Sequence, residues 1–186
     1  MKHDFLSGQL VELTPVTLEN DLPLWEKWDH DSEYQRQLNL NPARCISSVS
    51  MKKWFEKEPS EAALFSIRER QEGKVIGFVE LDGYEWSART AWVGIAIGEA
   101  EYRGKGYGTE AMNLLLKFAF RALNLHRVNL NVFDFNKRAI RSYEKSGFHY
   151  EGTSRECIYK EDQRWDVLNM GILQRDWEAL QTVPAE

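Results

Sequence analysis

Hydrophobic and polar residues alternate along several short stretches of the chain, and a period of two is typical of β-strands that are buried on one face. One further stretch, from Trp92 to Ile97, carries no charge at all, which predicts a central strand buried on both faces. Together the two patterns predict seven strands, at residues 9–13, 63–67, 75–84, 92–97, 128–132, 150–159 and 165–173.

Helical spacing appears most clearly after the central strand. Between Thr109 and Ala122 the apolar residues recur at intervals of three and four, which predicts a helix with one buried face. Capping residues and helical spacing predict shorter helices elsewhere. One such helix is expected after Thr17, and a second, beside a loop, within the polar stretch 30–49. A third follows Ser50, with Trp54 and Phe55 as buried anchors, and a fourth runs from 136 to 146. Residues 181–186 are expected to be frayed.

Strands and helices therefore mix along a chain of 186 residues, a length suited to a single domain spanning residues 1–186. The strands at 92–97 and 128–132 are separated by the main helix. A strand, a helix and a second strand in this order predict parallel pairing through a right-handed crossover. The expected fold is thus α/β (α+β), with a mixed sheet.

The turn between the central strand and the main helix carries Gly104, Gly106 and Gly108 at alternate positions. Glycines allow positive φ angles, so several N–H groups can point into one concavity that binds an anion. The positive end of the following helix and the charges of Arg103 and Lys105 add to this preference. The turn predicts a phosphate or pyrophosphate site; the alternative is a tight turn with two solvated cations.

Two known phosphate-binding loops fit this turn less well. The nucleotide P-loop requires a different glycine spacing followed by Lys and Ser or Thr. The dinucleotide fingerprint is matched only in part, with Asp134 at a tolerable distance. Fewer than eighty residues follow Gly108, and this length is too short for the repeated βαβ units of a dinucleotide domain.

Composition narrows the function classes. The net charge of −5 argues against a nucleic-acid-binding face and favours a cationic substrate. Cys45 and Cys157 show no paired spacing, and the four histidines show no ligand spacing, so neither a disulfide framework nor a metal site is predicted. The first residues lack an apolar signal core and no run is long enough to span a membrane, so a cytoplasmic location is expected.

The segment Arg103-Gly104-Lys105-Gly106-Tyr107-Gly108 resembles the acetyl-CoA signature of the GNAT superfamily of N-acetyltransferases. A second resemblance to that superfamily lies between Asn136 and Phe148 and includes Ala139, Tyr143 and Gly147. Within the superfamily the chain looks similar to the bacterial branch that acetylates ribosomal-protein N termini and polyamines. The resemblance implies a mixed sheet of about seven strands flanked by about four helices, with acetyl-CoA as co-substrate.

The resemblance also implies roles for individual residues. The backbone of the central strand is expected to pair with the pantetheine arm, and the glycine turn to hold the pyrophosphate. Asn136 contacts the cofactor or caps its helix, and Arg138 reaches the 3′-phosphate. The expected cofactor-binding residues are Ile95, Ala96, Ile97, Arg103, Gly104, Lys105, Gly106, Tyr107, Gly108, Thr109, Asn136 and Arg138.

Tyr143 is the expected general acid for the leaving thiolate, with a buried core tyrosine as the alternative. An aliphatic amine is mostly protonated at neutral pH, so a carboxylate has to accept its proton. Glu33, Glu80, Asp82 and Glu99 are candidates, and the sequence does not rank them.

The expected function is therefore direct transfer from acetyl-CoA to a primary amine in a ternary complex. A polyamine and a protein or peptide N terminus fit equally well as acceptors. An antibiotic is a weaker third acceptor. The alternative from another class is a sensor or regulatory module that binds acetyl-CoA without turnover. A homo-oligomer is compatible with the resemblance, but no sequence feature specifies one.

Overall fold

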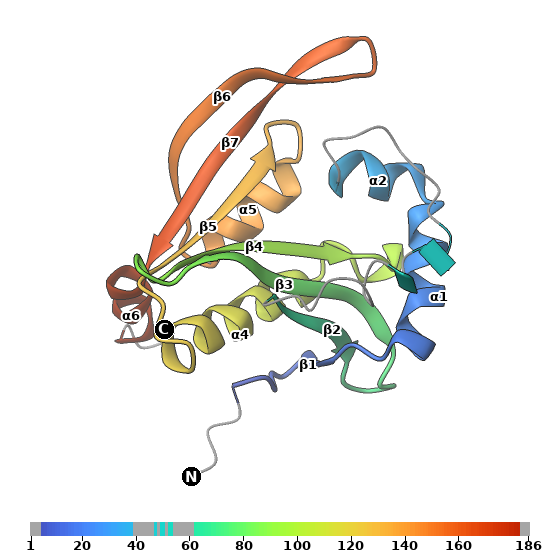
Figure 1. The fold of residues 1–186 in the computed structure, drawn as a ribbon, viewed down its shortest axis with the longest axis horizontal. Coiled ribbons are helices and arrows are strands. Elements are labelled where there is room, and N and C mark those ends of the chain that lie inside the picture. Colours follow the sequence, from blue (N-terminus) through green and yellow to red (C-terminus); the bar gives the residue numbers. More distant parts are fainter. Residues whose placement is uncertain (1–4, 39–46, 48, 51, 54–61, 183–186) are drawn as a thin grey trace.

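The computed structural model describes residues 5–38, 47, 49–50, 52–53 and 62–182. Its centre is one seven-stranded sheet with the order β1-β2-β3-β4-β5-β7-β6 (Figure 1). All neighbours pair antiparallel except β4 and β5, which are parallel. The strands are β1 (Val11–Pro15), β2 (Ala63–Glu69), β3 (Val75–Glu85), β4 (Thr90–Ile97), β5 (Arg127–Phe133), β6 (His149–Lys160) and β7 (Gln163–Leu173).

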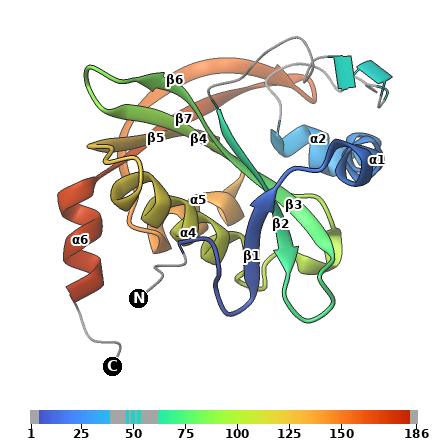
Figure 2. The same cartoon turned by 60° about the horizontal axis from the view of Figure 1, so that its bottom comes forward.

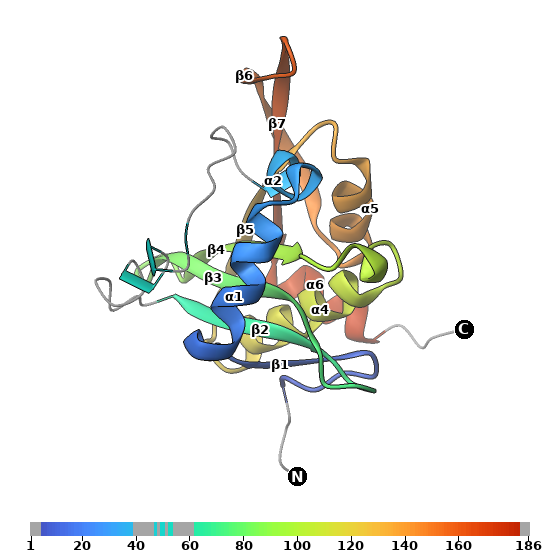
Figure 3. The same cartoon turned by 90° about the vertical axis from the view of Figure 1, so that its right-hand side faces the viewer.

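Helices cover the two faces of the sheet unequally (Figure 2). Helices α4, α5 and α6 lie on one face, whereas α1 and α2 cover part of the other. A side view shows the long β6–β7 hairpin projecting beyond the body of the molecule (Figure 3). The bounds are α1 (Leu18–Asp29), α2 (Ser32–Leu38), η1 (Ala100–Tyr102, a 3-10 turn), α4 (Tyr107–Arg121), α5 (Lys137–Lys145) and α6 (Gln174–Thr182).

Helix α4 forms the centre of the main hydrophobic core. The residues of its predicted apolar stripe from Ala111 to Ala119 pack against the sheet, most of them fully buried. At its C-terminal end Phe120 contacts Trp177 of α6, with ring centroids 5.4 Å apart. Burying such a contiguous apolar face is the main source of stability for a helix of this length.

The predicted strands are all present, and the parallel pairing of β4 with β5 is confirmed. Two expectations were wrong. Strand β4 is not buried on both faces, because the Trp92 side chain near its beginning is 41% exposed. Residues 174–182 form α6, so Gln181 and Thr182 continue a helix that Trp177 anchors, and residues 183–186 lie outside the described part.

The helix predicted after Ser50 lies largely outside the described residues, which include neither Trp54 nor Phe55. The shorter helices predicted after Thr17 and from residue 136 are present as α1 and α5, and α2 occupies the stretch that was expected to hold a short helix. No described helix is long and apolar enough to cross a membrane.

Strands β4 and β5 separate soon after they begin, and this separation positions the site. Their register joins Thr90, Ala91 and Trp92 to residues 127–129, and no pairing follows. Strand β4 nevertheless continues to Ile97 and β5 to Phe133. The two strand ends therefore form a fork in the middle of the sheet (Figure 1).

Candidate active site

A cavity of about 670 Å³ lies at the fork between β4 and β5. Its lining comes from five places: the separated ends of β4 and β5, the glycine turn, the cavity side of α5, helix α2, and the inner part of the β6–β7 hairpin. Arg103, Arg138, Arg141 and Lys145 are its charged lining residues within the described chain, and all four are cations. The cavity is therefore suited to an anionic ligand of considerable length.

The edge of β4 that faces the cavity is made of backbone groups. The N–H of Gly98 donates to the carbonyl of Ile76 on β3 at 2.9 Å. The backbone N–H and C=O groups of successive residues in a strand point to alternate sides. The backbone groups of Val93, Ile95 and Ile97 therefore point away from β3, into the fork. Ala96 lines the cavity, but its backbone groups face β3. The backbone of Ala96 is therefore not free to pair with a ligand as predicted, whereas that of Ile95 and Ile97 points into the fork.

The glycine turn leads from this edge into α4. Gly104 and Gly106 have φ angles of 76° and 93°, which residues with a side chain rarely adopt, and Gly106 is the N-cap of α4. The N–H groups of Tyr107, Gly108 and Thr109 lie in the first turn of the helix, where no carbonyl of the helix can accept from them. Gly104, Gly106, Gly108 and Thr109 line the cavity, so the turn presents an anion-binding helix end to it.

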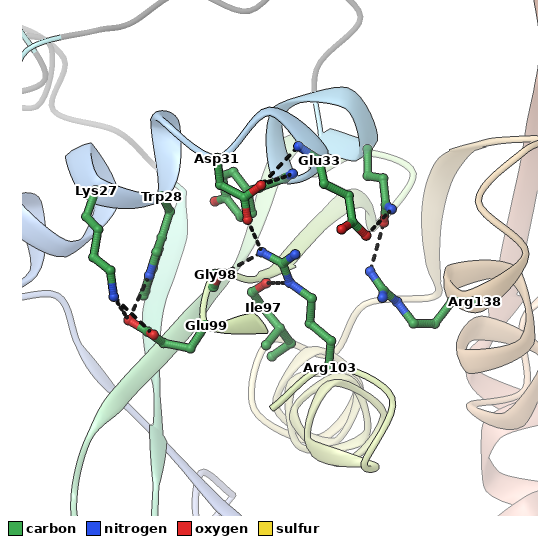
Figure 4. A network of polar contacts seen from close by, with 11 residues as sticks. Lys27, Trp28, Asp31, Glu33, Ile97, Gly98, Glu99, Arg103 and Arg138 are labelled. Atoms are coloured by element: carbon green, nitrogen blue, oxygen red, sulfur yellow. Dashed lines mark hydrogen bonds and ion pairs between the residues drawn. The ribbon is translucent and has the colours of Figure 1, made fainter. Parts of the chain in front are cut away.

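The cations at the cavity are distributed differently from the prediction. Lys105 and Tyr107 do not line the cavity, and the Lys105 side chain is exposed. The guanidinium of Arg103 is bound within the protein, donating to the carbonyls of Ile97 and Gly98 and pairing with Asp31 (Figure 4). Its charge is therefore already engaged within the protein, and the contribution of Arg103 to a phosphate site stays a prediction.

Helix α5 supplies the other three cations. Arg138, Arg141 and Lys145 recur at intervals of three and four and all line the cavity. Arg138 was predicted, whereas Arg141 and Lys145 were missed, although their spacing from Arg138 is a signal that the sequence contains. Arg138 also donates to Gln37 of α2 at 2.8 Å.

Two hydrogen bonds fix α5 beside the cavity. Asn136 is the N-cap of α5 and accepts from the N–H of Ala139 at 3.1 Å, so the predicted capping is confirmed and the residue also lines the cavity. The hydroxyls of Thr109 and Ser142 lie 2.7 Å apart and join α4 to α5. The stripe of cations is thereby held at a fixed distance from the glycine turn.

Tyr143 projects from α5 to the wall of the cavity. Its ring packs edge-on against Phe148, with centroids 6.0 Å apart. Burial raises the pKa of its hydroxyl to about 12, so the group is protonated at neutral pH. Within the described chain no residue forms a hydrogen bond with this hydroxyl, which leaves the proton available to a bound ligand.

Glu80 of β3 lies on the sheet face that α1 and α2 partly cover, which is the face opposite to α5. It lies directly across from Gly94 of β4. A Cβ atom at Gly94 would lie 2.9 Å from Oε1 of Glu80, so the carboxylate occupies the space that this glycine leaves. Burial, together with the charge of Asp82, raises the pKa of Glu80 to about 7. The described residues include no hydrogen-bond donor or ion-pair partner for it. Gly94 lines the cavity and Glu80 does not, so this carboxylate, with a pKa of about 7, lies directly behind a residue of the cavity wall.

Residues 11–149 match the family described as "Acetyltransferase (GNAT) domain". The chain belongs to the GNAT family. The spermidine N(1)-acetyltransferase of Escherichia coli (strain K12) is 32% identical over 180 residues, 97% of this chain and 95% of that protein. The putative ribosomal N-acetyltransferase YdaF of Bacillus subtilis (strain 168) is 31% identical over 107 residues, 58% of each chain.

Among solved structures, the spermidine N-acetyltransferase from Vibrio cholerae in complex with CoA and spermine is similar, with a TM-score of 0.83 and 25% sequence identity. The similarity covers 92% of this chain and 99% of that chain. The GNAT fold predicted from the motifs is therefore confirmed. So are the enzyme class, an N-acetyltransferase, and acetyl-CoA as its co-substrate.

The remaining carboxylates predicted as bases in this GNAT protein are placed less favourably. Glu99 is 5% exposed and accepts from Lys27 and from the indole of Trp28 on the far side of β4 (Figure 4). Burial alone would raise the pKa of Glu99, but these hydrogen bonds outweigh it and hold the pKa below its usual range. Glu33 is exposed on α2 and accepts from Gln37 at 3.2 Å.

Asp82 shares the sheet face of Glu80 and lies opposite the exposed Trp92. Partial burial raises the pKa of Asp82 as well. The two carboxylates are two residues apart on one strand, so their side chains point to the same face at a spacing of about 6.8 Å. The acidic face beside Gly94 thus contrasts with the cationic lining of the cavity.

Proposed function

We propose that this GNAT enzyme transfers the acetyl group of acetyl-CoA directly to a primary amine of a polyamine. The observation that carries the proposal is Glu80, a half-buried carboxylate without a partner in the described chain, placed against Gly94 at the edge of the cavity. A carboxylate whose pKa is near neutral is a stronger base than an ordinary one, and a substantial fraction of it is unprotonated at neutral pH and able to accept the proton of an ammonium.

In the proposed reaction the ammonium loses its proton to Glu80, directly or through a water molecule. The free amine nitrogen then attacks the thioester carbon, and a backbone N–H from the fork edge of β4 stabilises the oxyanion. The carbon–sulfur bond breaks, the nitrogen releases its second proton to solvent, and the thiolate takes a hydrogen bond from the Tyr143 hydroxyl. The products are an amide and the CoA thiol.

The pKa of Tyr143 defines its role in this scheme. A proton moving fully from a phenol of pKa about 12 to a thiolate with a pKa of about 8.5 would cost about 5 kcal/mol, since each unit is worth about 1.4 kcal/mol. We therefore assign Tyr143 the role of a hydrogen-bond donor to the developing thiolate. Bulk solvent completes the protonation after bond cleavage.

Three observations support a polyamine as the acceptor. The spermidine N(1)-acetyltransferase of E. coli aligns over 97% of this chain, including α1, α2 and β3, whereas the ribosomal relative aligns over 58%. Glu80 and Asp82 offer two carboxylates on one sheet face, at a spacing comparable to that between neighbouring nitrogens of a polyamine. The chain as a whole carries a net charge of −5, which attracts polycations.

The test is the release of CoA thiol from acetyl-CoA with a panel of acceptors. Spermidine and spermine are compared with butylamine, with peptides bearing Ala or Ser at the N terminus, and with an aminoglycoside. The proposal predicts the highest kcat/KM with a polyamine and a much higher KM for butylamine, which lacks the second charge.

Preference for the peptides would replace the polyamine by a protein N terminus, the second acceptor class. An absence of turnover with every amine, together with calorimetric binding of acetyl-CoA, would favour the sensor. Such a sensor would bind the cofactor at the glycine turn and report it to a partner protein.

A further inference from the structure

Arg103 is the fixed basic residue of the cofactor signature, yet its guanidinium is directed into the protein. The side chain is 8% exposed. Nε donates to the carbonyl of Ile97 at 3.0 Å, and Nη2 donates to the carbonyl of Gly98 at 2.7 Å. The same Nη2 lies 3.0 Å from Oδ2 of Asp31. Every one of these partners belongs to the protein, as Figure 4 shows.

Asp31 connects this guanidinium to α2. Its other oxygen, Oδ1, accepts from the N–H groups of Glu33 and Tyr34 at 2.9 and 3.2 Å, so Asp31 closes the start of the helix. Burial alone would raise the pKa of Asp31, but the hydrogen bonds from Tyr34 and Arg103 outweigh it and keep the pKa below its usual range. The contact therefore persists at all pH values at which the enzyme is expected to work.

Helix α2 in turn shapes the acceptor side of the cavity. Tyr34 and Gln37 line the cavity, and the ring of Tyr34 lies 5.9 Å from the Arg103 guanidinium. Tyr34 packs in the small hydrophobic cluster that covers the β3–β4 face near Ala96. The charge of Glu80 contributes to the raised pKa of Tyr34, after burial and Asp29, which places the tyrosine near the proposed base.

The other end of α2 has its own anchors. Arg36 forms a two-pronged ion pair with Glu161 at the tip of the β6–β7 hairpin, and Lys160 donates to the carbonyl of Arg36. Gln37 accepts from Arg138 of α5. Loss of the Asp31 contact would thus free the start of α2 while its end stays attached.

We propose that Arg103 is a positioning residue that couples the cofactor turn to the acceptor side through Asp31. Arg103 directly precedes Gly104, so a cofactor bound at the glycine turn restrains the backbone from which the guanidinium projects. The guanidinium holds Asp31, Asp31 holds the start of α2, and α2 presents Tyr34 beside Glu80. Binding of acetyl-CoA therefore orders the acceptor side and increases the affinity for the amine.

The variant Asp31→Asn separates this role from helix capping. Asparagine caps a helix about as well as aspartate, so the start of α2 remains closed. The neutral amide no longer offers Arg103 a charged acceptor. Arg103→Lys makes the complementary change, because an ammonium keeps the charge but cannot reproduce the fork of donors. Glu178→Gln is the matched control, since it removes a comparable ion pair, to Arg121, between α4 and α6 away from the cavity.

The kinetic readout rests on the proposed function, because it requires an amine substrate. For Asp31→Asn we expect the KM for the amine to rise about tenfold while the calorimetric Kd of acetyl-CoA stays within about twofold of wild type. Arg103→Lys should behave alike, and the double variant should be no worse than either single one. A strongly weakened acetyl-CoA Kd in Arg103→Lys with a normal amine KM would overturn the proposal and make Arg103 a phosphate ligand.

Hydrogen exchange of the α2 amides tests the coupling without turnover. Addition of CoA should slow exchange across residues 32–38 in wild type and in Glu178→Gln, and should have little effect in Asp31→Asn. An equal response in wild type and Asp31→Asn, or no response in wild type, would overturn the coupling. A protein that acetylates no amine but shows the expected exchange pattern would refute the proposed function and leave the coupling intact.

Discussion

The proposed cofactor wall and the proposed acceptor wall of the cavity differ in both charge and construction. The cofactor wall, formed by the glycine turn and α5, offers backbone N–H groups and the cations Arg138, Arg141 and Lys145. The acceptor wall, formed by β3, β4 and α2, lies beside the carboxylates Glu80 and Asp82, which do not themselves line the cavity. On the proposed function, the anionic acetyl-CoA would meet the cations and the cationic amine would meet the carboxylates.

The two walls also differ in how they depend on sequence. The cofactor wall comes from two short motifs, the glycine turn and α5, and its proposed function depends largely on backbone geometry at a few glycines. The acceptor wall assembles side chains from α2, β3 and β4, which no short motif joins. Damage to the first should abolish cofactor binding, whereas damage to the second should reduce turnover and leave the cofactor bound.

The largest effect is expected for Gly106→Asp in the cofactor wall. Aspartate at a φ of 93° strains the turn and places a negative charge where phosphate is expected. We expect the Kd of acetyl-CoA, measured by calorimetry, to rise more than about 100-fold, which corresponds to about 2.7 kcal/mol. Gly73→Asp is the matched control, because Gly73 also has a positive φ but lies in the β2–β3 turn. An unchanged Kd for Gly106→Asp would remove the turn from the cofactor site.

The acceptor wall is tested by Glu80→Gln. Loss of a general base lowers turnover by about 10²- to 10⁴-fold, and the Kd of acetyl-CoA should stay near that of wild type. In wild type, kcat/KM should rise with pH through about 7 as Glu80 loses its proton, and this inflection should be missing from the variant. Glu85→Gln, at the end of the same strand, is the control. Retained activity with the same pH profile would exclude Glu80 as the base.

Tyr143→Phe is expected to have a smaller effect, because Tyr143 acts as a hydrogen-bond donor. Removing one donor to a developing charge lowers kcat by about 10- to 100-fold, with little change in cofactor affinity. Steady-state kinetics and calorimetry measure the two quantities, and Tyr159→Phe, on the exposed end of the β6–β7 hairpin, is the control. Unchanged turnover would return Tyr143 to a packing role.

The smallest effect concerns stability. The pKa of Glu80 is about 7 in the folded protein and close to 4.5 when exposed, so the folded state binds more protons between these values. Stability contributed by the protonated group is therefore lost as pH rises toward 7. We expect wild type to lose about 2 kcal/mol between pH 5 and pH 8 relative to Glu80→Gln, measured by urea unfolding. Parallel pH curves for the two proteins would contradict the raised pKa.

The contrast between the walls also explains which features could be predicted from the sequence. The strands, α4 and the glycine turn follow from patterns local to the chain, and the second motif led to Asn136 and Tyr143. The engagement of Arg103 could not be foreseen, because Asp31 lies 72 residues earlier and meets it only in the folded sheet. Glu80 could not be ranked above Glu99 for the same reason, since burial and nearby donors decide between them.

Strand pairing stops where β4 and β5 part, and if the pantetheine arm pairs with β4 as expected, the co-substrate becomes a structural component of the sheet. The backbone groups of Val93 and Ile95 face the fork, and the amides of a pantetheine arm can complete their hydrogen bonding. Cofactor supply then becomes a determinant of how long the folded enzyme persists. At a concentration 100 times its Kd, a ligand of the folded state alone adds about 2.7 kcal/mol to the free energy of unfolding. A cell short of acetyl-CoA would hold a less durable enzyme as well as an idle one.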